Sequence, residues 1–315
     1  MKKVTAIILA SLMLFVMLAA CAGSGTSGDT PPASAPTPAP ASTPAATTAP
    51  EQSTTEDPAE TFDTDRIIAI FTREDGSGTR DAFVSITGVG DDMYIEAVVQ
   101  NETAQILTSV ETNETGIGYV SVGSLSDSVK ALSIDGVLPS NETIMNGTYS
   151  LQRPFLVAVT DEKKSDPLVQ DFIDFMLSVE GQELAARRTT KALDNPAAYS
   201  SSGLSGVIKV GGSTSVEPLM QLMREAYIAL NPDVEIEISG GGSGTGINEA
   251  TEGVLDIGMS SRELRPAEKE KLTDIAIALD GVAVIVNAVN PINELSLEQV
   301  REIFVGEITR WKQLS

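Results

Sequence analysis

Three short loops rich in glycine and hydroxyl side chains hold the residues best suited to chemistry. The first, 73–80 (REDGSGTR), follows a β-branched run, and the second, 239–246 (SGGGSGTG), follows another. The third, 211–215 (GGSTS), repeats the pattern after the run 207–210. Each loop leads into a segment that can form a helix, so its glycines would bring backbone N–H groups and the positive helix end close to a ligand. This arrangement predicts a site for an anion.

The ligand that these loops predict is a small oxyanion. No loop continues into the Gly-Lys-Ser/Thr of a nucleotide-binding P-loop, and none has the GxGxxG spacing of a dinucleotide site with a well-placed acid. A single Gly/Ser loop is more often an ordinary turn. Three loops that each follow a strand and open a helix favour a binding site, with Arg73 as the charged donor.

The composition excludes several classes of catalytic site. The 315 residues include no histidine and one cysteine, which rules out a Ser-His-Asp triad, a His-ligated zinc, a cysteine cluster and an intrachain disulfide. A formal net charge of −23 is a poor match for nucleic acid, whose phosphates need a basic surface. Carboxylate chemistry, a lysine or serine nucleophile, or binding alone remain.

The first 64 residues are typical of an export and anchoring segment. Two lysines, an apolar run at 4–18 and the small residues before Cys21 predict a signal peptide over 1–20. The segment 18–21 (LAAC) resembles a bacterial lipobox, which implies cleavage before Cys21 and a lipid on its thiol. The alternative is an ordinary signal peptide with an incidental cysteine. Residues 21–64 then predict a lipidated cysteine and a disordered Pro/Thr/Ala stalk, which would tether the protein to the extracytoplasmic face of the cell membrane.

The remainder of the chain has an α/β pattern. Runs of β-branched residues predict strands at 66–71, 207–210, 234–238 and 282–286. Apolar residues at helical spacing predict helices within 168–179, 216–230 and 297–304. Such an alternation implies sheets covered by helices on both faces. The polar segment 194–206 predicts a linker of about 12 residues between a helix and a strand.

Six segments together resemble the substrate-binding protein of the bacterial phosphate ABC importer. They are GSTSVEP (212–218), SGGGSGTGI (239–247), DIGMSSREL (256–264), REDGSGTRDAF (73–83), GIGYVSVGSL (116–125) and FVGEITRWKQL (304–314). The resemblance implies an α/β, two-lobed periplasmic-binding-protein-like fold of type II with a ligand cleft between lobes that close by hinge motion. It also implies capture of inorganic phosphate for a membrane permease, without catalytic residues, cofactor or metal. We expect a monomer that binds no nucleic acid.

The order of these segments differs from that of the family. In the family the GSTS segment comes first and ITRWKQL leads into REDGSGTR, whereas this chain begins with the REDGSGTR half. We expect a circular permutation, with the ends near Arg66 and Ser315 close in space and 194–206 joining the exchanged halves. One lobe would be 66–152 plus 283–315 and the other 153–282, with hinge strands near 280–286 and 151–159. A fragment of a tandem or misassembled gene is the alternative.

The resemblance assigns phosphate-binding residues position by position. One lobe would supply Arg73, Ser77, Gly78 and Thr79, and the other Thr214, Ser215, Ser243 and Ser261. Ser261 stands where some family members carry an acid that accepts a proton from phosphate and repels sulfate, so this filter would be lost.

Two further residues would support the site. Asp75 would orient Arg73, or would serve as a turn or cap acid. Arg262 would add a second positive contact, or would be a surface arginine paired with Glu263 or Glu268.

The sequence therefore leaves three hypotheses for the function. The first is a lipid-anchored receptor that passes phosphate to a permease. The second is an oxyanion sensor or adhesion head that has lost transport. The third is an enzyme such as a phosphatase using Asp or Ser, which the sequence disfavours because no metal-ligand cluster accompanies those residues. We expect binding without catalysis.

Overall fold

The computed structural model describes residues 62–314, and all of these belong to the same unit of the chain. The predicted signal peptide, Cys21 and the stalk up to residue 61 lie outside the described residues. Within 62–314, no helix is long and apolar enough to span a bilayer.

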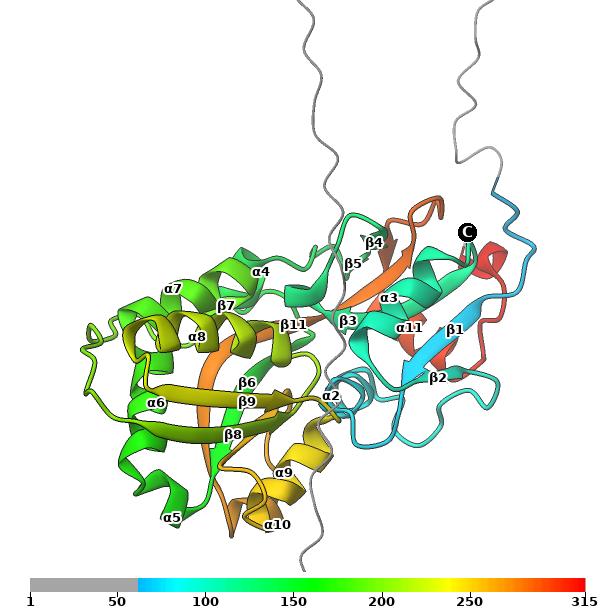
Figure 1. Cartoon of the computed structure of the whole chain (residues 1–315). Helices are drawn as coiled ribbons and strands as arrows, with labels where there is room; N and C mark the ends of the chain where they lie inside the picture. Colours follow the sequence, from blue (N-terminus) through cyan, green and yellow to red (C-terminus); the bar gives the residue numbers. More distant parts are fainter. Residues whose placement is uncertain (1–61, 315) are drawn as a thin grey trace, which may run out of the picture. The chain divides into compact units, whose positions relative to one another are not determined.

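Buried apolar side chains form separate cores on the two sides of the molecule, which define two halves. Half A consists of 62–151 and 282–314 and has its main core around Trp311, with a smaller cluster around Ile106. Half B consists of 155–278 and has its main core around Tyr227, with a smaller cluster around Ile247. The chain passes between the halves along β6 (Gln152–Val159) and β11 (Thr273–Asn287) (Figure 1).

Half A is built on parallel strands with helices on both faces. Its strands are β1 (Ala69–Arg73), β2 (Val98–Gln100), β3 (Gly116–Ser121), β4 (Val129–Ala131), β5 (Ser133–Ile134) and β12 (Glu294–Leu295). Its helices are α2 (Gly78–Thr87), α3 (Thr103–Glu111), η1 (Val122–Ser124), α4 (Asn141–Met145), α11 (Leu297–Phe304) and η2 (Trp311–Leu314). Helices α2 and α11 contribute to the main core, whereas α3 contributes to the smaller cluster. All six residues of β3 are buried, as expected for a strand covered on both faces.

Half B repeats this layered arrangement. Its strands are β7 (Thr190–Lys191), β8 (Gly206–Gly212), β9 (Val234–Ser239) and β10 (Ile257–Ser260). Its helices are α5 (Asp161–Lys164), α6 (Pro167–Leu177), α7 (Val179–Arg188), α8 (Glu217–Leu230), α9 (Ser243–Thr251) and α10 (Pro266–Lys269). The predicted apolar stripe of α8 is buried at Leu219, Met220, Met223 and Tyr227. Apolar residues alternate with exposed glutamates along β9, which lies at the sheet edge.

A single path of paired strands crosses both halves, in the order β2-β1-β3-β11-β6-β10-β8-β9. Pairs β1–β3 and β8–β10 are parallel, whereas β11 is antiparallel to both β3 and β6. In the β6–β11 register, Arg153 lies opposite Asp280. The long strand β11 thus joins the sheets of the two halves.

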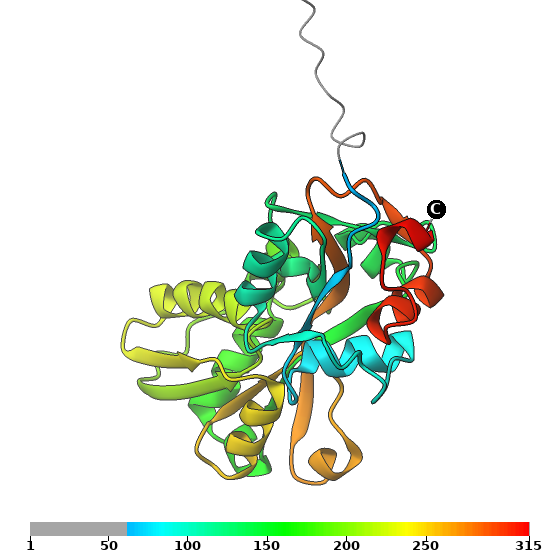
Figure 2. The ribbon, with the colours of Figure 1, turned by 90° about the vertical axis from the view of Figure 1, so that its right-hand side faces the viewer.

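The first described residues lie beside the last ones (Figure 2). The backbone N–H of Ile68 donates to the carbonyl of Thr309 at 2.9 Å, and that of Lys312 donates to the carbonyl of Thr64 at 2.9 Å. The ring of Phe62 meets Trp311 edge-on at 6.4 Å. These contacts hold both ends of the described chain in half A.

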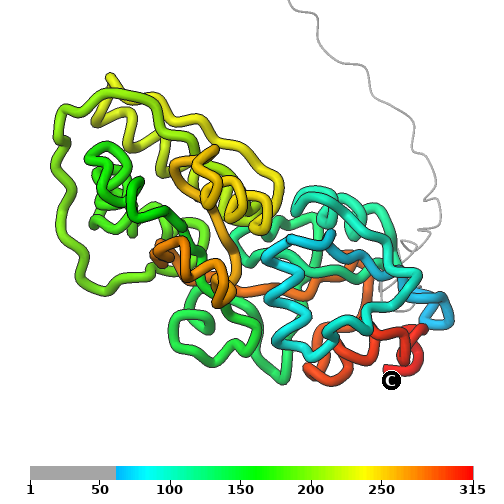
Figure 3. The backbone as a smooth tube through the Cα atoms, turned by 90° about the horizontal axis from the view of Figure 1, so that it is seen from below, coloured from blue at the N-terminus to red at the C-terminus, as the bar shows by residue number. Residues whose placement is uncertain are grey.

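The segment 194–206 has no helix or strand before Gly206 and follows the outer edge of half B (Figure 3). It is held by specific contacts. Its Tyr199 donates from Oη to Asp171 at 2.6 Å and from the backbone to Glu180 at 2.9 Å. Tyr227 donates to the same Asp171 oxygen at 2.7 Å. Burial and the Asp171 carboxylate raise the pKa of Tyr199 to about 12.

Candidate functional site

Hydroxyl side chains from the two halves meet between them in a group that we call the hydroxyl cluster. Half A contributes Thr79 and Thr103, and half B contributes Ser213, Thr214, Ser215, Ser243 and Ser261. All of these side chains except that of the half-buried Thr214 are buried. A group of this kind offers many hydrogen-bond donors and acceptors but no negative charge of its own.

Helix N-termini from both halves converge on the hydroxyl cluster. Helices α2, α3 and α9 begin at Gly78, Thr103 and Ser243, and α8 follows the turn that holds Ser213–Ser215. No side chain caps α3 or α9, and the residue before α9, Gly242, has a φ of 89° that favours glycine. First-turn N–H groups without intrahelical partners and the helix dipoles are therefore directed toward this region, which favours an anion.

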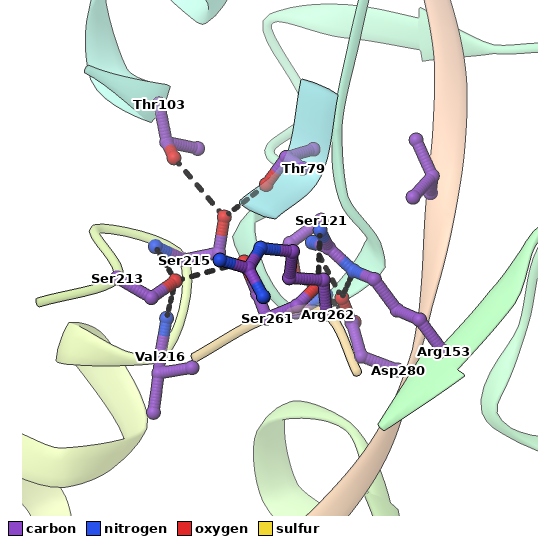
Figure 4. Close-up of polar contacts among 12 residues, drawn as sticks. Thr79, Thr103, Ser121, Arg153, Ser213, Ser215, Val216, Ser261, Arg262 and Asp280 are labelled. Carbon is purple, nitrogen blue, oxygen red and sulfur yellow. Dashed lines mark hydrogen bonds and ion pairs between the residues drawn. The ribbon is translucent and has the colours of Figure 1, made fainter. Parts of the chain in front are cut away.

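Hydrogen bonds within the cluster cross from half A to half B (Figure 4). The hydroxyls of Thr79 and Ser215 are 2.8 Å apart, and Thr103 lies 3.3 Å from Ser215. Within half B, Ser213 donates to the hydroxyl of Ser261 at 2.9 Å. The Ser261 backbone N–H donates to Ser243 Oγ at 3.1 Å.

Arg73 supplies the positive charge of the site. Its side chain is 2% exposed, and its guanidinium donates to Thr103 at 3.1 Å and to Thr214 at 3.1 Å. The Glu74 carboxylate accepts two further bonds from it, at 2.8 and 2.9 Å. A guanidinium has donors in a fixed planar fork, so this one can contact residues of both halves at once.

The expectation that Asp75 orients Arg73 is wrong. The Asp75 side chain is 93% exposed and pairs with Arg80 at 2.5 Å, whereas Glu74 holds Arg73. Asp75 lies in the turn after β1, which directs its side chain away from the buried guanidinium. Two adjacent acids follow Arg73 in the sequence, and only the course of this turn distinguishes them.

The predicted residues Ser77 and Gly78 lie at the start of α2. Ser77 is the N-cap residue, and its hydroxyl accepts from the backbone N–H of Arg80 at 3.4 Å. Gly78 packs against half B, because a Cβ placed on it would lie 2.3 Å from Ser243 Oγ and 2.7 Å from Ser261 Oγ. The glycine is therefore needed for the close approach of the two halves.

Arg262 is buried beside the cluster and is neutralised by acids. Its guanidinium donates to both oxygens of Glu268 at 2.8 Å. Of the two roles that the sequence left open, the structure therefore shows the ion pair with Glu268. The side chain is nevertheless not at the surface. Its Nε lies 2.9 Å from Asp81 of α2, which also accepts from Arg265 at 2.9 Å. These ion pairs cross between the halves.

Glu268 stays charged in this network. Burial raises the pKa of its carboxyl, but the bonds from Arg262 and Arg265 outweigh burial and leave the pKa below its ordinary value.

Several residues of the site were not predicted. Thr103 opens a helix after β2, and Ser213 belongs to the GGSTS loop, so the strand–loop–helix pattern could have indicated both. Arg153 and Asp280 form a buried ion pair behind Ser261, with Nη2 of Arg153 at 3.1 Å from Asp280 Oδ2. The signal for this pair is an isolated acid within the apolar run of β11.

A cavity of about 560 Å³ opens beside the cluster. Thr103 and Thr214 line it, together with Arg188 and Glu217. Its walls come from both halves, so it lies where the cluster meets the surface. Within the described residues, no group of three or more His, Cys, Asp or Glu side chains is placed to hold a metal ion.

Comparison with known proteins identifies the family. The model of the PBP superfamily domain matches residues 56–180 and 195–315. The phosphate-binding protein PstS 2 of Streptococcus pneumoniae is 44% identical over 256 residues, which cover 78% of this chain and 87% of that protein. PstS of Bacillus subtilis is 34% identical over 113 residues, which cover 35% of this chain and 38% of that protein.

A solved structure agrees with this assignment. The crystal structure of the phosphate-binding protein of a phosphate ABC transporter from S. pneumoniae has 43% sequence identity and a TM-score of 0.66. It matches over 79% of this chain and 100% of that one. The chain belongs to the PBP superfamily and, within it, to the family of the PstS phosphate-binding proteins.

Proposed function

We propose that this protein captures inorganic phosphate and delivers it to the permease of a phosphate ABC importer. The observation that carries this proposal is the buried hydroxyl cluster with Arg73, at which the N-termini of helices from both halves converge. Hydroxyls, first-turn N–H groups and one guanidinium can donate to every oxygen of a tetrahedral anion. The S. pneumoniae relatives are known as phosphate-binding proteins, which supports phosphate as that anion.

Binding without turnover is the role that the residues favour. The sequence contains no histidine to act as a general base near neutral pH. The serines and threonines of the cluster contact one another, Arg73 or backbone N–H groups, and within residues 62–314 none is hydrogen-bonded to a carboxylate that could activate it.

The two halves are proposed to act as lobes that close on the ligand. Their cores are separate, and the chain crosses between them twice, through β6 and β11. Two crossing strands can serve as the hinge, while the Arg73 contacts and the Asp81 ion pairs would form on closure.

We propose in addition that the chain is a circular permutant of other family members. The first and the last described residues are adjacent in half A, which supports this. The pattern of matches supports it as well. An exchange of halves limits a continuous alignment with an unpermuted relative to about one half of the chain. The B. subtilis protein aligns over 35% of this chain, as expected for an unpermuted relative, whereas the S. pneumoniae protein aligns over 78%, as expected for one with the same order.

A lipid on Cys21 is the proposed attachment to the cell membrane. The LAAC segment after an apolar run supports it. Mass spectrometry of the mature protein would detect the diacylglyceryl cysteine, and Cys21→Ala should release the protein into the medium.

Calorimetric titration tests the proposed function. The purified protein, stripped of bound anion, is titrated with phosphate and then with sulfate. We expect one phosphate per chain. Sulfate should compete more strongly than in relatives with an acid at the Ser261 position, because serine does not repel an anion that carries no proton. A folded protein that binds neither anion would refute the proposal.

A further inference from the structure

Arg153 is a further buried arginine close to the hydroxyl cluster, in addition to Arg73 and Arg262, and the proposed binding of phosphate does not use it. Its Nε and Nη2 donate to Oδ2 of Asp280 at 3.2 and 3.1 Å. Its remaining terminal nitrogen, Nη1, donates to the backbone carbonyl of Ser261 at 3.0 Å. The side chain also lies over the ring of Phe155, 5.5 Å from the centroid. One planar fork thus joins a crossing strand to a loop of the cluster.

Asp280 extends the connection into half A. Its Oδ1 accepts from the backbone N–H of Gly123, at 3.3 Å, in the segment that follows β3. Gly123 itself has no room for a side chain, because a Cβ there would lie 2.9 Å from the carbonyl oxygen of Arg188 in half B. Arg153 and Asp280 lie opposite each other on β6 and β11. A continuous series of contacts therefore runs from half A, through both crossing strands, to Ser261 of half B.

A buried ion pair in this position is costly. The side chains of Arg153 and Asp280 are 2% and 0% exposed. Burial raises the pKa of Asp280 and lowers that of Arg153, so the charge on each depends on the other. A buried ion pair contributes little net stability compared with apolar residues in its place. This favours a role in which the pair fixes the positions of the groups to which it is bonded.

The position of Ser261 depends on this contact. Its carbonyl is held by Arg153, its backbone N–H by Ser243 and its hydroxyl by Ser213. If the carbonyl lost its partner, the peptide between Ser261 and Arg262 could rotate, and Ser261 would keep only two of its three hydrogen-bonded contacts. Its hydroxyl would then be held less firmly in the cluster.

We propose that Arg153 is a positioning residue of the oxyanion site, which fixes Ser261 relative to the two crossing strands through its bonds to Asp280 and to the Ser261 carbonyl. This inference rests on the proposed phosphate binding. It assigns to Arg153 no contact with the ligand.

Arg153→Lys tests the proposal, because lysine keeps a positive charge beside Asp280 but lacks the fork that reaches Ser261. Phosphate Kd is measured by calorimetry well below the unfolding temperature of each variant. We expect Kd to rise about tenfold or more, the effect of losing one hydrogen bond from a charged donor. Amide hydrogen exchange of the unliganded protein should become faster around Ser261. Arg66→Lys, in the exposed ion pair with Glu114, is the matched control and should change neither.

A double variant separates positioning from stability. Arg153→Met leaves Asp280 buried without its partner and should lower the unfolding temperature strongly. Adding Asp280→Asn removes that charge while keeping an acceptor for Gly123. The double variant should regain much of the unfolding temperature but keep the weak phosphate binding. Recovery of phosphate affinity together with stability would overturn the proposal, as would an unchanged Kd in folded Arg153→Lys.

The controls distinguish a failure of the positioning role of Arg153 from a failure of the proposed phosphate binding. If wild-type protein and Arg66→Lys bind phosphate and Arg153→Lys binds equally well, only the positioning role is refuted. If wild-type protein binds neither phosphate nor sulfate, the proposed function is refuted. The exchange measurement needs no ligand, so unchanged protection around Ser261 in Arg153→Lys contradicts the positioning role in either case.

Discussion

Gly78→Ala should weaken phosphate binding without unfolding either half. Gly78 is the first residue of α2 in half A, and its Cα faces two serines of half B. The new Cβ would lie 2.3 Å from Ser243 Oγ, 2.7 Å from Ser261 Oγ and 3.0 Å from Ser243 Cβ. Rotation of the hydroxyls cannot relieve all three contacts, because the Cβ of Ser243 is fixed by the start of α9. The halves must therefore separate.

The size of the effect follows from these distances. Bringing the shortest contact to an ordinary separation of about 3.4 Å requires a movement of about 1 Å if the Ser243 hydroxyl keeps its place, and the contact with Ser243 Cβ still requires about 0.4 Å if the hydroxyl rotates. An extra methyl group in a tightly packed position costs about 1–3 kcal/mol. That cost corresponds to about a 5- to 150-fold rise in the Kd for phosphate. Within α2 alone, alanine is a better helix former than glycine by up to about 1 kcal/mol. Stability without ligand should therefore change little or increase.

Two measurements on the same protein check this prediction. Calorimetry gives the Kd for phosphate, and urea unfolding without anion gives the free energy of unfolding. Ser85→Ala is the control, because Ser85 is exposed on α2 and gains the same kind of helix propensity without contacting the hydroxyl cluster. An unchanged Kd for Gly78→Ala would show that the halves do not approach each other in this way when the ligand binds.

Four further predictions follow from the site and its surroundings. Asp81→Asn removes the carboxylate that pairs with Arg262 and Arg265 of the other half. The Kd for phosphate should therefore rise about two- to tenfold and should depend less on salt. Titrations at several salt concentrations measure both effects. Glu74→Gln should lower the free energy of unfolding in urea by more than about 1 kcal/mol because buried Arg73 loses its carboxylate, whereas Asp75→Asn should change it by less than about 0.5 kcal/mol. Ser261→Asp should raise the ratio of sulfate Kd to phosphate Kd in competition titrations, because the new carboxylate repels a fully deprotonated anion. Burial is the main cause that raises the pKa of Tyr199 from 10.0 to about 12. The raised pKa contributes stability that is complete below pH 10 and is lost as the pH rises toward 12. Tyr199→Phe should therefore flatten the decline of the unfolding free energy over this pH range.

The segments that sequence patterns located well are those whose structure depends on neighbouring residues. The apolar stripe at 216–230 becomes the buried face of α8, and the alternation at 234–238 becomes β9. The glycine and hydroxyl loops after β1, β8 and β9 become helix N-termini at the site. These features depend on side-chain periodicity and on the freedom of glycine, which act over a few residues.

Partners that are distant in the chain could not be assigned in this way. Arg153 bonds to Asp280 and Ser261, which are 127 and 108 residues away. Arg262 reaches Asp81 in the other half. Such pairings follow from the register of β6 against β11 and from the packing of α2 against half B, neither of which has a local signal.

The sequence by itself determined that the chain has three loops rich in glycine and hydroxyl side chains on an α/β framework and no histidine for catalysis, because these depend on residue type and local spacing. Only the tertiary structure decided that Glu74 holds Arg73, that Arg262 is neutralised across the two halves, and that Arg153 donates to the Ser261 carbonyl. The physical reason is that a buried charge takes whichever opposite charge or carbonyl the packed fold places within hydrogen-bond distance. That neighbour is set by strand register and the contact between halves.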